Sequence, residues 1–255
     1  MFPHRLRQAL NLVLAVAQLA LPATFFASGF NADSTARAPL AADPNPATPA
    51  GYAFVIWGAI YIGAAIYAAV QALPRYRDDS LFRRIGWFTI MGYACCCTWL
   101  YAARFGPVWL TVPLIFEMLL SLGRAFILSA DAFYSNPSWE KRVTVVPLAL
   151  YVGWLSAAAF VNAADVLPGY GFDRFGLGAE GYGRLTVLLA AATAIAFAAR
   201  TKGFPVYIAT VVWALIGIIA ANGGTAFDNS IAWVSGGSVG ALVIIAFAVR
   251  RRRVI

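Results

Sequence analysis

Long apolar runs separated by short polar segments dominate this chain. Eight runs are visible, at about residues 9–26, 52–73, 85–103, 108–129, 143–164, 182–199, 206–221 and 231–249. Most approach the roughly 20 residues that a helix needs to cross about 30 Å of hydrocarbon. The pattern therefore predicts an all-α protein of the lipid bilayer, a polytopic membrane helix bundle with about eight transmembrane helices.

Basic residues mark the ends of these runs and predict an orientation. With the N-terminus counted as inside, fourteen of the nineteen Arg and Lys residues fall in inside segments and four in outside segments, while Arg124 lies within a run. Cytoplasmic loops carry an excess of Lys and Arg, so the alternation predicts that both termini are cytoplasmic. The net charge of +8 belongs mostly to these inside segments, and no nucleic acid partner is expected.

Few residues of the chain are suited to catalysis or metal binding. The single His, His4, precedes the first run, so the bilayer holds no axial haem ligand of that type. Cys95, Cys96 and Cys97 are adjacent, and neighbours on a helix point about 100° apart, so the three thiols cannot converge on one metal. No Walker loop, GxSxG or HExxH sequence occurs. We therefore expect no metal site and no enzyme activity.

Two stripes of aromatic residues lie within the runs. Each repeats at helical spacing, so its members share one helix face. The stripes consist of Phe54, Trp57 and Tyr61 in the second run, and of Tyr151, Trp154, Ala158 and Asn162 in the fifth. Inward-facing stripes of this kind are able to line a pocket for a flat apolar ligand. Ordinary interhelical packing, with anchoring at the lipid head groups, explains the same pattern.

Two ionisable residues lie inside the fourth run. Arg124 follows Glu117 by seven residues, about two turns along the same helix face. An ionisable group at that depth is a functional candidate, so this intramembrane polar pair is compatible with a transport pathway. The alternatives are that Arg124 extends toward the cytoplasmic surface and that Glu117 is protonated or hydrogen-bonded to a neighbouring helix.

Three motifs in chain order resemble one known family. They read PAGYAFVIWGAIY at 49–61, CCTW at 96–99 and YxxWxxxAxxxN at 151–162. They resemble the second, third and fifth helices of the TspO/MBR family, the tryptophan-rich sensory proteins related to the mitochondrial translocator protein. Cys96 stands where the family usually has Asn. The last three runs have no counterpart in five-helix members, so the chain looks like the longer bacterial branch.

This resemblance implies a five-helix bundle with a ligand cavity under the first outer loop. Residues 27–51, which contain four prolines, would form the lid. Family members bind porphyrins and other tetrapyrroles, and some bind sterols. No cofactor is required, but a bound porphyrin or other tetrapyrrole is the implied ligand. The matching positions are Tyr52, Trp57, Tyr61, Trp99, Tyr151, Trp154 and Asn162, and Phe54 joins them from its place on the first stripe.

The resemblance also predicts the organisation of the chain. Residues 1–165 are expected to form the TspO-like bundle, and residues 166–255 three additional helices with a basic C-terminal tail. We expect a bacterial inner-membrane protein that binds a small hydrophobic ligand for sensing, trafficking or regulation. The alternatives are a transporter of such a ligand and a structural or pigment-contacting subunit of a larger membrane complex. The GxxxG motif at Gly236 and Gly240 suits packing within the chain or a homodimer equally.

Overall fold

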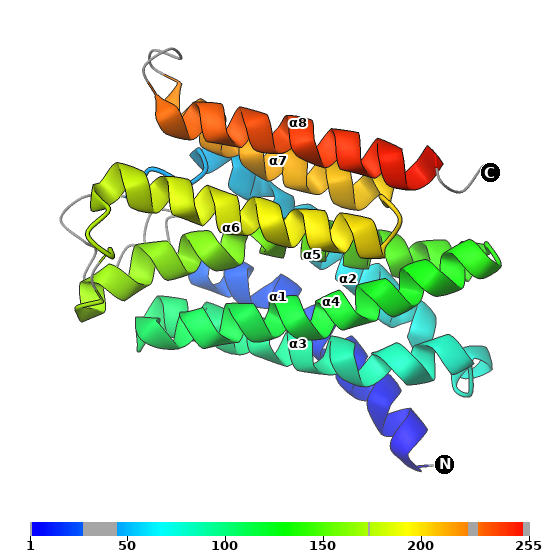
Figure 1. Ribbon diagram of the computed structural model, residues 1–255. Helices are drawn as coiled ribbons and strands as arrows, with labels where there is room; N and C mark the ends of the chain where they lie inside the picture. Colours follow the sequence, from blue (N-terminus) through cyan, green and yellow to red (C-terminus); the bar gives the residue numbers. More distant parts are fainter. Residues whose placement is uncertain (1, 28–44, 173, 224–228, 252–255) are drawn as a thin grey trace. The chain divides into compact units, whose positions relative to one another are not determined.

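The computed structural model describes residues 2–27, 45–172, 174–223 and 229–251. Within these ranges every regular element is helical, which confirms the predicted all-α fold. One long helix lies on each of the eight apolar runs (Figure 1). These helices are α1 (Phe2–Ala27), α2 (Ile56–Ala72), α3 (Ser80–Phe105), α4 (Thr111–Ser135), α5 (Trp139–Val166), α6 (Gly178–Arg200), α7 (Pro205–Asn222) and α8 (Ser230–Arg251).

In the part of the chain that the structure describes, four short 3-10 helices adjoin the long ones. They are η2 (Gly51–Val55), η3 (Pro74–Tyr76), η4 (Val108–Leu110) and η5 (Leu167–Tyr170). Because η2 leads directly into α2 and η4 into α4, the second and fourth predicted spans each combine a 3-10 turn with an α-helix. Most of the helices also extend past the apolar runs by several residues, since their polar ends continue the helical hydrogen bonding beyond the hydrocarbon-spanning part.

Seven helical segments of the described ranges are long and apolar enough to cross a membrane, from Gly51–Ala72 to Ser230–Arg251. Helix α1 is not among them, so its crossing stays a prediction. The segment that contains α5 is the most enclosed, with 72% of its span buried against 28% for α8. The protein is therefore a polytopic membrane helix bundle.

The helices pack as two compact units. The first comprises Met1–Thr35 and Trp57–Val152, and the second Ala36–Ile56 and Gly153–Ile255. Helix α5 contributes its first part to the first unit and its second part to the second. These units follow packing and not the predicted division after residue 165, which stays a prediction.

In the first unit, α3 packs against α4, and α1 packs against α3 (Figure 1). Small residues allow the close approach. A Cβ atom added at Gly92 of α3 would meet Leu122 Cγ of α4 at 2.4 Å, and one added at Gly63 of α2 would meet Pro147 Cβ of α5 at 3.1 Å. A side chain at Gly92 would overlap Leu122, and one at Gly63 would crowd Pro147.

Helix α1 presents a polar face to the first unit. Gln8 Nε2 donates to Gln71 O at 2.6 Å, and Gln71 Nε2 donates back to Gln8 O at 3.0 Å. One turn further, Asn11 Nδ2 donates to Gly86 O at 3.0 Å and Asn11 Oδ1 accepts from Thr89 Oγ1 at 2.6 Å. Buried amides need such partners, so these bonds fix the rotation of α1 against α2 and α3.

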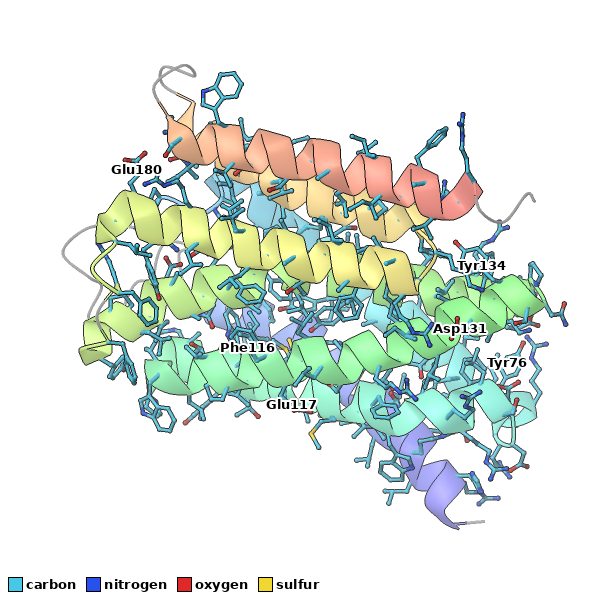
Figure 2. The ribbon with its side chains drawn as sticks, in the orientation of Figure 1. Tyr76, Phe116, Glu117, Asp131, Tyr134 and Glu180 are labelled. Atoms are coloured by element: carbon cyan, nitrogen blue, oxygen red, sulfur yellow. The ribbon has the colours of Figure 1, made fainter. Side chains whose placement is uncertain are left out.

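In the second unit, α8 packs along both α6 and α7 (Figure 1). Gly203, in the left-handed conformation with φ 65°, follows α6 and lies against the backbone of Ala246 on α8, where an added Cβ atom would come within 2.8 Å of the carbonyl oxygen. At the other end of the α6–α8 pair, Ser230 Oγ donates to Glu180 Oε1, which is labelled in Figure 2. The three C-terminal helices thus form a packed group.

Asp79 defines where α3 begins. Its carboxylate Oδ1 accepts hydrogen bonds from the backbone N–H groups of Leu81 at 2.9 Å and Phe82 at 3.0 Å. This is N-capping, which satisfies donors that the helix itself leaves unpaired.

We expect Asp79→Ala to destabilise the protein by about 1 kcal/mol, because the two donors lose their acceptor. Thermal unfolding in detergent should show a midpoint about 2–4 °C lower. Asp78→Ala is the matched control, since Asp78 is exposed and carries the same charge. Equal midpoints for the two variants would contradict the capping role.

Candidate functional site

Four of the predicted site residues meet in the first unit, around Trp57. The Trp57 ring stacks with Tyr61 at 5.3 Å between centroids and 29° between planes, and with Trp99 of α3 at 6.1 Å and 27°. Tyr151 of α5 meets Trp57 edge-on at 6.0 Å, and stacks with Tyr93 of α3 at 6.3 Å and 17°. These five rings, from α2, α3 and α5, are called the Trp57 cluster below.

The Trp57 cluster has three buried rings, called its floor below, and two more accessible rings. Tyr61, Tyr93 and Tyr151 are buried, whereas Trp57 and Trp99 are half-buried. The ring planes of Tyr61 and Trp99 are inclined to that of Trp57 by 29° and 27°. A flat ring system is able to extend such a set of stacked rings by offset stacking.

Polar groups contact two of the three buried tyrosines. Tyr151 OH donates to Gln18 Oε1 of α1 at 3.0 Å, and Cys96 Sγ lies 3.7 Å from Tyr61 OH as a weak donor. Gln18 is fully buried, and its Nε2 has no hydrogen-bond partner among the described residues. The sequence analysis did not select Gln18. An amide in the middle of an apolar run was the signal that could have found it.

The remaining aromatic site residues belong to the second unit. Phe54 of η2 meets Trp154 of α5 edge-on at 5.6 Å, and Tyr52 meets Trp213 of α7 edge-on at the same centroid distance. Trp213 Nε1 also donates to Ala53 O at 3.0 Å. Trp213 was not among the predicted residues. Trp213 follows Pro205 by the same number of residues as Trp57 follows Pro49, but this sequence spacing alone did not indicate a contact.

The chain that leads into η2 is held by hydrogen bonds to α5 and α7. Ala50 N donates to Gly217 O at 2.9 Å, and Asn222 Nδ2 donates to Pro46 O at 2.7 Å. The hydrogen bond to α5 is that of Thr48 Oγ1, which donates to Asp165 Oδ1 at 3.1 Å. Residues 45–56, called the anchored segment below, therefore have a defined place in the second unit. Most of the predicted lid, residues 28–44, lies outside the described residues.

A glycine on α7 makes room for the anchored segment. A Cβ atom added at Gly217 would meet Ala53 Cβ at 2.8 Å and Pro49 Cβ at 3.1 Å. The absence of a side chain lets the two backbones approach closely enough for the Ala50–Gly217 hydrogen bond. Sequence reasoning did not select Gly217, because one glycine in an apolar run has many uses.

The other predicted polar residues lie on α5 and α4. Asn162 is half-buried in the second-unit part of α5. Glu117 is half-buried on α4 (Figure 2) and Arg124 is exposed on the same helix. An exposed guanidinium suits the alternative in which Arg124 extends toward the membrane surface. The transport pathway through this pair stays a prediction.

Two further sequence features are also placed. Gly236 and Gly240 of the GxxxG motif are exposed, and a Cβ atom added at either would meet nothing within 4 Å. The motif is therefore not used for packing within the described part of the chain, and the homodimer stays a prediction. In the same ranges, no group of three or more His, Cys, Asp or Glu side chains could hold a metal ion.

Seven apolar helical segments, with aromatic clusters between helices, define a multi-pass, all-α membrane protein. The sequence model for TSPO-like proteins matches residues 8–248. The chain therefore belongs to the TSPO-like protein family, as the motifs indicated. The match runs through α6, α7 and α8, so the helices that have no counterpart in five-helix members are part of what this model describes. Comparison with curated proteins and with solved structures gave no significant match.

Proposed function

We propose that the protein binds a small, flat, hydrophobic ligand of the tetrapyrrole type at the Trp57 cluster, for sensing, trafficking or regulation. The observation that carries this proposal is the meeting of Trp57, Tyr61 and Trp99 with their ring planes within 29° of Trp57. Membership of the TSPO-like family supports it. Sterols and pigments of similar shape are the nearest alternatives in ligand chemistry.

The distribution of burial supports a ligand that stacks and is not enclosed by the rings. Trp57 and Trp99 already contact one another, so the ligand would add to their accessible faces and not insert between them. Beneath them, the Tyr151–Gln18 hydrogen bond holds the floor in one orientation. A preorganised aromatic surface loses little conformational entropy when a ligand binds.

The proposal includes no catalytic step. The expected role is binding in a bacterial inner membrane, as the family resemblance implies. The alternation of Arg and Lys along the chain predicts that both termini are cytoplasmic. A homodimer or a partner in a membrane complex would be additional to binding at the Trp57 cluster.

Titration of the purified protein in detergent with protoporphyrin tests the proposal. Quenching of Trp fluorescence by the porphyrin should saturate for the wild-type protein. Trp57→Phe and Trp99→Phe should each weaken binding by about fivefold to tenfold, because each removes part of an aromatic face. A sterol, a carotenoid and a phospholipid form the comparison panel.

Trp87→Phe is the matched control. Trp87 lies on α3 like Trp99, but it is 51% exposed, and its loss likewise removes one of the eight Trp side chains. Its affinity should equal that of the wild-type protein. Saturable binding that is unchanged in Trp57→Phe and Trp99→Phe would place the ligand elsewhere, and no saturable binding of any compound in the panel would reject the proposal.

A further inference from the structure

Arg7 is a buried cation in the first unit. Only 1% of its surface is exposed. Its side chain lies across α3 at Gly86, where an added Cβ atom would meet Arg7 Cδ at 2.5 Å. Because glycine occupies this position, the arginine stem can pass between α1 and α3. A guanidinium remains protonated in proteins, so a full positive charge is held inside this end of the unit.

The guanidinium has more donors than acceptors around it. Arg7 Nη2 donates to Arg77 O at 3.1 Å, but Arg7 Nε and Nη1 are buried without a hydrogen-bond partner among the described residues. The side-chain Nε of Arg77 is likewise buried and unpaired. Leaving charged donors unpaired in the interior is costly. Arg7, and Arg77 whose backbone carbonyl it contacts, therefore each have a buried donor that an added acceptor would satisfy.

The surrounding charges favour an anion. Asp78, Asp79 and Arg83 are the charged groups close enough to Arg7 for an electrostatic interaction with its guanidinium. Neither carboxylate accepts a hydrogen bond from Arg7, and Asp79 already caps α3. With Arg7, Arg77 and Arg83 against two aspartates, this end of the unit is positively charged, which attracts anions.

We propose that Arg7 and Arg77 bind a phosphate group, supplied by an anionic lipid head group or by a free phosphate. Phosphate matches the planar donor set of arginine and forms charge-assisted hydrogen bonds with it. Arg7 and the η3–α3 connection lie where the positive-inside pattern predicts the cytoplasmic membrane surface. The site is separate from the Trp57 cluster and does not depend on the proposed function.

Native mass spectrometry of the full-length protein tests the site, with phosphatidylglycerol and phosphatidylcholine offered in equal amounts. The wild-type protein should retain phosphatidylglycerol preferentially. Arg7→Gln should lower that retention about tenfold, because it removes charge-assisted hydrogen bonds. The matched control is Arg5→Gln, since Arg5 is exposed on the same helix, and it should stay within about twofold of the wild-type protein.

A second arm separates the two sources of phosphate. Inorganic phosphate at millimolar concentration should raise the thermal unfolding midpoint of the wild-type protein, but not of Arg7→Gln, if a free anion is bound. A lipid site would respond to phosphatidylglycerol alone. If Arg7→Gln does not fold, Arg77→Gln replaces it in both arms. The proposal is overturned if the wild-type protein shows neither response. It is also overturned if Arg7→Gln, or Arg77→Gln in its place, retains as much phosphatidylglycerol as Arg5→Gln.

Discussion

Gly217→Val is expected to displace the anchored segment from α7. The new side chain would overlap Ala53 and Pro49, whose Cβ atoms lie 2.8 Å and 3.1 Å from the position of an added Cβ. Both contacts are with short, stiff residues that cannot swing aside, so the backbones must separate. The hydrogen bond from Ala50 N to Gly217 O, now 2.9 Å long, would then be lost.

The expected cost of Gly217→Val is about 3 kcal/mol, combining overpacking with the lost hydrogen bond. Thermal unfolding in detergent, followed by circular dichroism, should show a midpoint about 6–12 °C lower. Limited proteolysis should cut the variant within residues 45–56 faster than the wild-type protein, since a released segment becomes accessible.

Gly236→Val on α8 provides the control for this substitution. Gly236 belongs to the same unit, and an added Cβ atom would meet nothing within 4 Å. The control makes the same change in helix propensity without overlap, and its midpoint should stay close to that of the wild-type protein. If Gly217→Val and Gly236→Val unfold at the same midpoint temperature, α7 does not hold the anchored segment.

Tyr151→Ala is expected to have the largest effect of any change in the Trp57 cluster. Tyr151 is 1% exposed and contacts both Trp57 and Tyr93. Its removal leaves a cavity in the floor of the cluster, which should cost about 3–5 kcal/mol. The unfolding midpoint should fall by about 6–20 °C, and porphyrin binding should weaken together with it.

Tyr151→Phe isolates the hydroxyl. Without it, Gln18 Oε1 loses its hydrogen bond and the buried amide has no partner on either atom among the described residues. We expect a cost of about 1–3 kcal/mol from this unpaired polar group. Tyr101→Phe is the control, because Tyr101 is 58% exposed on α3. If both variants unfold at the same temperature, the Tyr151–Gln18 bond contributes nothing to the floor.

Only part of the Trp57 cluster could be predicted from helical periodicity, which is a local property. Trp99 was indicated by the family resemblance, and Tyr93 was not selected. The spacing of Trp57 and Tyr61, four residues apart, puts both rings on one face of α2, and the structure stacks them. Phe54 and Trp154 were also predicted as site residues, but they contact one another in the second unit. Periodicity gave the helix face on which each ring lies. It did not give the neighbouring helix that this face contacts.

Other residues could not be predicted because their importance depends on partners far away in the sequence. Gln18 matters through Tyr151, which is 133 residues away. Gly217 matters because the anchored segment, more than 160 residues earlier, lies against it. In the sequence, Arg7 is only one of the basic residues near the N-terminus. Its importance depends on Gly86, which leaves space for the arginine side chain between α1 and α3.

The sequence by itself determined that this protein is an all-α membrane bundle with a helix on each apolar run, because the free energy of placing a residue in hydrocarbon acts on each segment separately. Only the tertiary structure decided that Trp57, Trp99 and Tyr151 meet, and that residues 45–56 pack with α7. Such contacts depend on the rotation of each helix about its axis and on where small residues permit close approach, and both are set by many distant residues together.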